Sequence, residues 1–191
     1  MASSQGQDAS FNALRAAYDA IHIKLSPSHE ERLIVQMERN LRAVGRYRAA
    51  ELVLGYRASG EEISARPYLL QAMQDGKRVA MPRLVKSDIV FELLVDDERA
   101  IDTGAVDEEL SLDDFDLAQS LCLVPGLVFD AEGYRVSYGA GFLDNFLREY
   151  PGLKVGLARG FNISSNPLPH AICDVPVDIL VSENAVWSCR R

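Results

Sequence analysis

The stretch "LCLVPGLVFDAEGYRVSYGAGFLDNFLREY", residues 121–150, decides the fold of this chain. Its first part, Leu121–Phe129, is apolar almost throughout, as is typical of a strand buried on both faces. The middle is rich in glycine and small residues, and the last part has apolar side chains at helical spacing. We therefore predict one buried strand, a loop over Gly133–Gly141 at the carboxyl end of that strand, and a helix that begins near Phe142.

The flanking segments repeat this alternation of strand and helix. Short aliphatic runs predict further strands at residues 51–56, 77–85, 89–95, 153–158 and 177–182. Helical signals predict a helix over residues 11–24, a second that begins at Pro27 with Ser26 as its cap, and a third that ends at Gly76. The pattern indicates an α/β fold with a mainly parallel central sheet and helices on both faces.

The composition is ordinary for a globular protein. The chain has 191 residues, of which 48% are hydrophobic and 25% are charged, and this size fits one domain. We assign residues 11–191 to that domain and expect residues 1–10 to be a disordered tail. The formal net charge of −8 argues against binding to nucleic acid or to an anionic membrane, but it leaves room for a small anion in a local basic pocket.

Cysteine usage and hydropathy predict a cytoplasmic protein. The three cysteines are far apart and show no CxxC spacing, which favours a reducing compartment over a disulfide framework. No run of about 18 apolar residues occurs, so we expect no membrane association. We interpret Cys173 as a small buried cysteine rather than a reactive thiol.

The loop before the last helix of this stretch has the features of a phosphate site. Gly139 and Gly141 flank Ala140, and glycine lets backbone N–H groups turn toward an anion at a helix start. Arg135 would neutralise phosphate charge, and Asp144 would reach a metal held by the phosphates. Each feature alone also fits a structural turn, a surface arginine or a solvated acid in a first helical turn.

Longer motifs resemble those of the 5-formyltetrahydrofolate cyclo-ligase family, also called methenyltetrahydrofolate synthetases. "VPGLVFD" and "GYRVSYGAGFLDNFL" resemble that family's "VPGLAFD" and "GxRLGxGGGYYDRFL". Upstream, "GEEISARPYLLQAMQDGKRVAMPR" is similar to its "GEVDTxPLIxxALxxGKxVxLPR", and "LRAAYDAIHIKLSPSHEER" to its "LRxxxxxxRxxLSPEER". Downstream, "LPHAICDVPVDILVSE" is similar to its "LPxExHDxxxDxIVTE". The resemblance therefore covers nearly the whole chain in order.

This resemblance implies a three-layer α/β/α fold and a ligase that forms a C–N bond. Such enzymes use ATP and Mg²⁺ to convert 5-formyltetrahydrofolate into 5,10-methenyltetrahydrofolate. The formyl oxygen is phosphorylated, the neighbouring nitrogen closes the ring, and phosphate leaves, so the chemistry needs a phosphate cradle and a metal rather than a protein nucleophile. The implied partners are a reduced folate and ATP, and we expect a monomer.

The resemblance also implies roles for particular residues. Arg135 is the implied catalytic residue, Glu62 and Tyr138 bind the folate, and Asp144 and Asp174 bind the metal. The implied ATP-binding residues are Arg15, Arg135, Ser137, Tyr138, Gly139, Ala140, Gly141 and Phe142.

Several positions depart from the family's pattern. Phe11 stands where the family has a lysine, and Asn145 where it has an arginine. The other departures are Ser137, Ala140, Leu143, Asn162, Ala171 and Cys173. Loss of two cations from an ATP site leaves a second hypothesis open, a non-catalytic or repurposed nucleotide- or folate-binding homologue. A third is another small-molecule enzyme of similar architecture.

Overall fold

The fold is built on one mainly parallel sheet. The computed structural model describes residues 13–17, 26–86, 88–138 and 141–189. Within these ranges the sheet has seven strands in the order β3-β2-β1-β4-β7-β8-β9. Their bounds are β1 Leu52–Leu54, β2 Arg78–Val85, β3 Asp88–Leu93, β4 Leu121–Val124, β7 Leu153–Leu157, β8 Ile179–Val181 and β9 Val186–Ser188. Neighbours are parallel from β2 to β8, and only the two edge strands β3 and β9 run antiparallel. The predicted mainly parallel sheet is confirmed.

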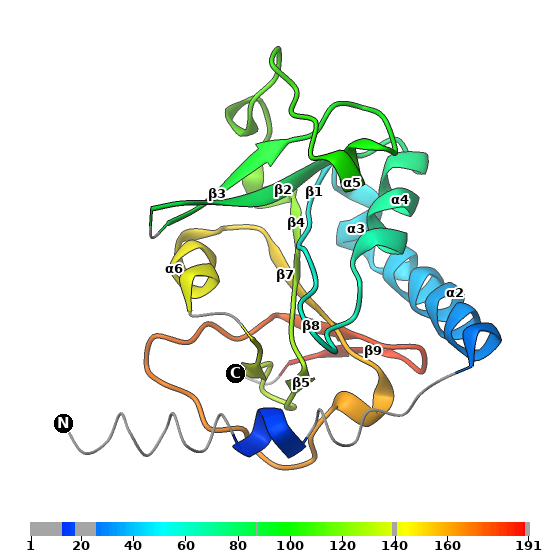
Figure 1. The fold of residues 1–191 in the computed structure, drawn as a ribbon, viewed down its shortest axis with the longest axis vertical. Coiled ribbons are helices and arrows are strands. Elements are labelled where there is room, and N and C mark those ends of the chain that lie inside the picture. Colours follow the sequence, from blue (N-terminus) through cyan, green and yellow to red (C-terminus); the bar gives the residue numbers. More distant parts are fainter. Residues whose placement is uncertain (1–12, 18–25, 87, 139–140, 190–191) are drawn as a thin grey trace.

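Helices cover both faces of the sheet, as predicted (Figure 1). The longer helices are α2 Pro27–Ala43, α3 Gly45–Ala49, α4 Arg66–Gln74 and α6 Phe142–Glu149. Figure 1 shows α2, α3 and α4 on one side of the strands and α6 on the other. The shorter helices are α5 Ala100–Thr103, η1 Leu112–Asp114, η2 Leu117–Gln119 and η3 Gly160–Asn162. None of the described helices is long and apolar enough to cross a membrane.

The amino-terminal predictions are only partly covered by the structure. Residues 13–17 are helical, whereas the rest of the predicted helix over 11–24 and the predicted tail over 1–10 lie outside the described residues. The assignment of residues 11–191 to a single domain stays a prediction.

Helix α2 begins at Pro27 after the cap residue Ser26, as the sequence predicts. Pro27 occupies its first turn, where the missing N–H needs no partner. Ser26 holds the cap position, yet its side chain accepts no bond from the helix backbone. Its Oγ lies 3.4 Å from the Oγ of Ser28 instead. Ser26 is therefore the cap residue, as predicted, and its carbonyl rather than its side chain accepts the first helical N–H bonds.

Two hydrophobic clusters divide the core between the faces of the sheet. Met37 and Tyr68 from the helices pack with Val53 of β1 in the first cluster. Leu54, the next residue of β1, belongs to the second cluster with Leu147 of α6. Successive side chains of a strand point to opposite faces, so both faces of β1 are buried and its sequence is apolar throughout.

The predicted single strand over Leu121–Phe129 was wrong, because the segment forms two strands. β4 ends at Val124, and a separate strand β5, Val128–Phe129, pairs antiparallel with β6, Arg135–Val136. Pro125 has no N–H to continue the ladder. Gly126 lies so close to the Phe129 ring that an added Cβ would come within 2.6 Å of it. The predicted loop over Gly133–Gly141 accordingly contains β6.

Candidate functional site

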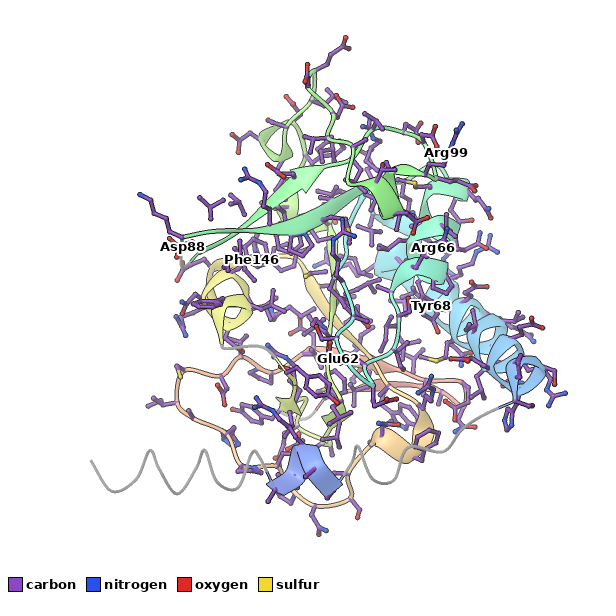
Figure 2. All side chains as sticks on the ribbon, in the orientation of Figure 1. Glu62, Arg66, Tyr68, Asp88, Arg99 and Phe146 are labelled. Atoms are coloured by element: carbon purple, nitrogen blue, oxygen red, sulfur yellow. The ribbon has the colours of Figure 1, made fainter. Side chains whose placement is uncertain are left out.

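A cavity of about 220 Å³ lies at the carboxyl ends of β1 and β4. Four separate segments line it, from the loops after β1 and β4, from the β2–β3 hairpin, and from β6 to the start of α6. The lining residues are Gly55, Tyr56, Arg57, Ser59, Glu62, Pro82, Ile89, Pro125, Arg135, Ser137, Gly141, Phe142, Leu143 and Asp144. In an open α/β sheet this edge is where ligands bind. Figure 2 shows Glu62 near the middle of the molecule, with Phe146 of α6 to one side.

Arg135 is a buried cation held from two directions. Its side chain is 5% exposed, and Nη2 donates to both carboxylate oxygens of Asp144 at 3.1 and 3.0 Å. Nη1 donates to the carbonyl of Val175 at 2.8 Å. The buried Nε has no hydrogen-bond partner among the described residues. A buried donor without a partner is costly.

Asp144 lies in the first turn of α6, where the sequence predicts it, and its side chain is 14% exposed. Besides the two bonds from Arg135, it accepts a bond from the backbone N–H of Val175 at 2.9 Å. Its negative charge is therefore compensated inside the protein. Across the described ranges, no three His, Cys, Asp or Glu side chains come together in a way that could hold a metal.

Asp174 stands apart from the cavity lining. Its Oδ2 accepts the N–H of Ala171 at 2.8 Å and so closes a turn of its own loop. The next residue, Val175, is the one that bonds both Asp144 and Arg135. The chain segment of Asp174 is thus joined to the predicted site, while its role as a metal ligand stays a prediction. Cys173 is exposed, so its interpretation as a buried cysteine was wrong.

Glu62 follows β1 and brings a carboxylate into the cavity. Its Oε2 accepts the N–H of Ser59 at 2.9 Å, and the backbone of Tyr138 donates a second bond. Burial raises the pKa of Glu62, and the two backbone bonds and the charge of Arg135 partly oppose that rise. Glu62 is therefore a hydrogen-bond acceptor of limited solvation beside the Arg135–Asp144 ion pair.

The other predicted residues meet around Tyr138. Arg15 donates from Nε to the carbonyl of Ser137 at 2.8 Å. The hydroxyl of Tyr138 lies 3.5 Å from the N–H of Glu61. The ring packs against Gly60, which has a φ of +53° and where an added Cβ would lie 2.7 Å from the ring. Tyr138 thus joins the loop after β1 to the predicted nucleotide loop.

The amino end of α6 opens onto the cavity. Gly141 caps this helix with a φ of +80°, a conformation that glycine adopts without strain, and no described atom lies within 4 Å of the position of an added Cβ. Phe142 is the first helical residue and lines the cavity with Gly141. Gly139 and Ala140 lie outside the described residues. Free N–H groups at a helix start favour an anion.

Sequence reasoning missed several lining residues. Arg57 is exposed on the loop after β1, and its position after a buried strand was a signal that could have found it. Pro82 and Ile89 had no such signal. The antiparallel β2–β3 pairing brings them to the cavity, and that pairing depends on tertiary packing.

Comparison with known proteins gives this site its context. A model of the 5-formyltetrahydrofolate cyclo-ligase family matches residues 8–183. The chain belongs to this family. This match confirms the resemblance that the motifs indicated. No curated protein sequence matches the chain.

Solved structures agree with this family membership. A 5,10-methenyltetrahydrofolate synthetase from Aquifex aeolicus is 27% identical over 95% of this chain and 93% of that chain, with a TM-score of 0.73. A 5,10-methenyltetrahydrofolate synthetase from Mycoplasma pneumoniae is 19% identical over 91% of this chain and 98% of that chain, with a TM-score of 0.68. The second likeness supports the fold alone.

Proposed function

We propose that this cyclo-ligase converts 5-formyltetrahydrofolate and ATP into 5,10-methenyltetrahydrofolate, ADP and phosphate. One observation carries the proposal: a single cavity gathers Glu62, the Arg135–Asp144 ion pair and the amino end of α6 in a member of this family. The first suits a pterin ring, the second a phosphoryl group in transfer, and the third a nucleotide phosphate.

Glu62 is proposed to bind the pterin end of the folate. As a carboxylate it accepts N–H groups of a planar heterocycle, and its two backbone donors fix its orientation. The cavity of about 220 Å³ is smaller than the roughly 300–1,000 Å³ that encloses a drug-sized ligand, so it suits the ring rather than a whole folate.

The nucleotide phosphates are proposed to lie at the start of α6. Gly141 leaves the approach to the helix N–H groups open, and Arg135 lines the same cavity as a cation. Arg15 supports this loop through the carbonyl of Ser137.

The chemistry follows from charge placement. A P–O bond forms between the formyl oxygen and the γ-phosphorus while the bond to ADP breaks, and Arg135 balances the charge on the transferring group. The neighbouring nitrogen of the folate then attacks the carbon of the phosphorylated formyl group and loses its proton. The C–O bond of that group breaks as phosphate leaves. Each step uses positioning and electrostatics, so no side chain needs to form a covalent intermediate.

Magnesium fits this site only as a companion of the nucleotide. The described residues contain no preformed metal cluster, and Asp144 lies in the first turn of α6, where the phosphates are proposed to bind. When bound, Mg²⁺ would neutralise phosphate charge with most of its ligands from phosphates and water. Asp174 is a proposed second carboxylate. A monomeric state and a cytoplasmic location stay predictions.

Turnover tests the proposal directly. The full chain is mixed with 5-formyltetrahydrofolate, ATP and Mg²⁺, and the absorbance of methenyltetrahydrofolate is followed. We expect product with wild type, strongly reduced product with Arg135→Gln, and normal product with the exposed control Arg99→Gln. No product at high protein concentration would reject the activity. Folate binding by calorimetry without turnover would instead indicate a non-catalytic binding protein.

A further inference from the structure

A second hollow lies far from the catalytic cavity. This groove of about 660 Å³ is formed by α2, α3, α4 and the residues just before β2. Its lining residues are Val35, Glu38, Arg39, Arg42, Ala43, Tyr47, Arg48, Gln71, Asp75 and Lys77. Figure 1 shows the three helices on the same side of the sheet. Lys77 directly precedes β2, so the groove lies at the amino ends of the parallel strands, opposite the edge that carries the cavity.

Lys77 is a buried cation with spare donors. The residue is 6% exposed, and Nζ donates to the carbonyl of Ala50 at 2.7 Å. Nζ also lies 4.8 Å from the centroid of the Tyr47 ring. An ammonium group has three N–H donors, and Ala50 is the one acceptor that it has among the described residues. Burial lowers the pKa of Lys77, as expected for a charge with few partners.

Asp75 attracts Lys77 electrostatically and partly opposes the lowering of its pKa, but the hydrogen bonds of Asp75 go to other donors. It accepts bonds from the Tyr47 hydroxyl at 3.0 Å and from Gln71 Nε2 at 3.1 Å, and it pairs with Arg42 at 3.0 Å. Its oxygens are therefore already committed to three donors. Glu38 is the other acid of the groove, and burial raises its pKa.

Positive charge is in excess here. Arg39 and Arg48 are exposed and line the groove, and the guanidinium group of neither forms an ion pair or hydrogen bond with another described residue. The groove has four basic and two acidic side chains, although the whole chain has a formal net charge of −8. A concave basic surface on an acidic protein concentrates field and favours an anion.

We propose that this groove binds a small phosphorylated molecule at a site separate from the catalytic cavity. Lys77 lines the groove although it is only 6% exposed, so a small anion suits this site better than the flat surface of a protein partner. Arg39 and Arg48 present planar guanidinium groups that suit phosphate in a bidentate geometry. Val35, which is 62% exposed, and Ala43 offer an apolar wall to the organic part of the ligand.

Calorimetry with inorganic pyrophosphate tests this site on the full chain at low salt. We expect binding to wild type, a loss of affinity of about tenfold or more in Arg39→Gln/Arg48→Gln, and an unchanged affinity in Arg32→Gln/Arg99→Gln, which removes two exposed arginines outside the groove. Arg39→Lys/Arg48→Lys should retain part of the affinity. Both altered groove residues are exposed, so the melting temperature of the unliganded variants should match wild type.

Four results would overturn the proposal. They are no pyrophosphate binding to wild type, equal losses in the groove and control variants, binding that depends on Arg135 but not on Arg39 and Arg48, and citrate binding at least as tight as pyrophosphate through the same two arginines. The third would place the anion in the catalytic cavity, and the fourth would make the site one for carboxylates.

Discussion

Asp130 and Asp144 flank the β6 strand, and the chain uses the same side chain in opposite ways at the two positions. Asp130 is 1% exposed and accepts backbone N–H groups only, from Glu132, Tyr134 and Leu168, at 3.0, 3.0 and 2.8 Å. Asp144 faces the cavity and accepts the guanidinium of Arg135 together with one backbone N–H.

The different hydrogen-bond donors of Asp130 and Asp144 distinguish an acid with a structural role from one that faces a cavity. Backbone donors are fixed by the fold, so the bonds of Asp130 tie the β5–β6 turn to the segment at Leu168 and leave nothing for a ligand. Arg135 is a side chain with an unpaired Nε, and Asp144 is only partly enclosed. In the proposed function, this ion pair would be shared with a phosphate and its metal, whereas the bonds of Asp130 would not.

Removing the structural acid should have the largest effect. Asp130→Ala deletes three hydrogen bonds to a charged acceptor and leaves buried N–H groups without partners, which should lower the free energy of unfolding by about 4 kcal/mol. The exposed control Asp88→Ala should change it by less than about 0.5 kcal/mol. Urea denaturation measures both. Equal stabilities of the two variants would break the comparison.

Asp144→Asn should instead act mainly on catalysis. The amide keeps an acceptor for Arg135 but loses the charge that a metal requires, so kcat should fall by about 100-fold and the Mg²⁺ dependence of ATP binding should be lost. Its loss of stability should be smaller than that of Asp130→Ala. Steady-state kinetics and ATP titrations with and without Mg²⁺ give both readouts. An unchanged Mg²⁺ dependence would discard the metal role.

Glu62 should give the cavity a pH dependence. Its pKa is raised, so it takes up a proton at a higher pH than an ordinary glutamate and then loses its role as a charged acceptor. The KM for the folate should therefore rise as pH falls through that raised pKa. Glu62→Gln should increase KM by about tenfold at neutral pH and remove the dependence. The exposed control Glu51→Gln should keep the wild-type profile, and a pH dependence that survives in Glu62→Gln would reassign it to another group.

Restoring positive charge at the proposed ATP site should have a smaller effect, on the affinity for ATP. Asn145 follows Asp144 on α6, and Phe11 lies outside the described residues. Phe11→Lys with Asn145→Arg should tighten ATP binding by about fivefold at low salt, and the gain should shrink as salt is added. Calorimetry at two salt concentrations measures the effect. A double variant that binds ATP no better at low salt would show that charge loss does not limit this pocket.

Local sequence patterns predicted the parts of this fold that local physics controls. The helix from Phe142 and the strand β7 have clear periodicity and boundaries, and both are present. The division of Leu121–Phe129 needed the antiparallel pairing of β5 with β6, which an apolar run does not reveal. Strand β9 was missed because its three residues are exposed and form an edge.

The sequence predicted which residues belong to the candidate site better than it predicted the contacts between them. The motifs indicated Glu62, Arg135 and Asp144, which the fold brings to one cavity. They did not indicate that Arg135 and Asp144 form an ion pair, since this depends on the turn between β6 and α6. The structural role of Asp130 was equally hidden, because one of its donors comes from Leu168, far along the chain.

Transfer of the formyl oxygen is the central claim of this account, and an isotope measures it directly. 5-Formyltetrahydrofolate labelled with ¹⁸O in the formyl group is incubated with the full chain, unlabelled ATP and Mg²⁺, and the released phosphate is analysed by mass spectrometry. If phosphorylation activates the formyl oxygen beside Arg135, each phosphate released with methenyltetrahydrofolate carries one ¹⁸O. Methenyltetrahydrofolate formed together with unlabelled phosphate would contradict the account.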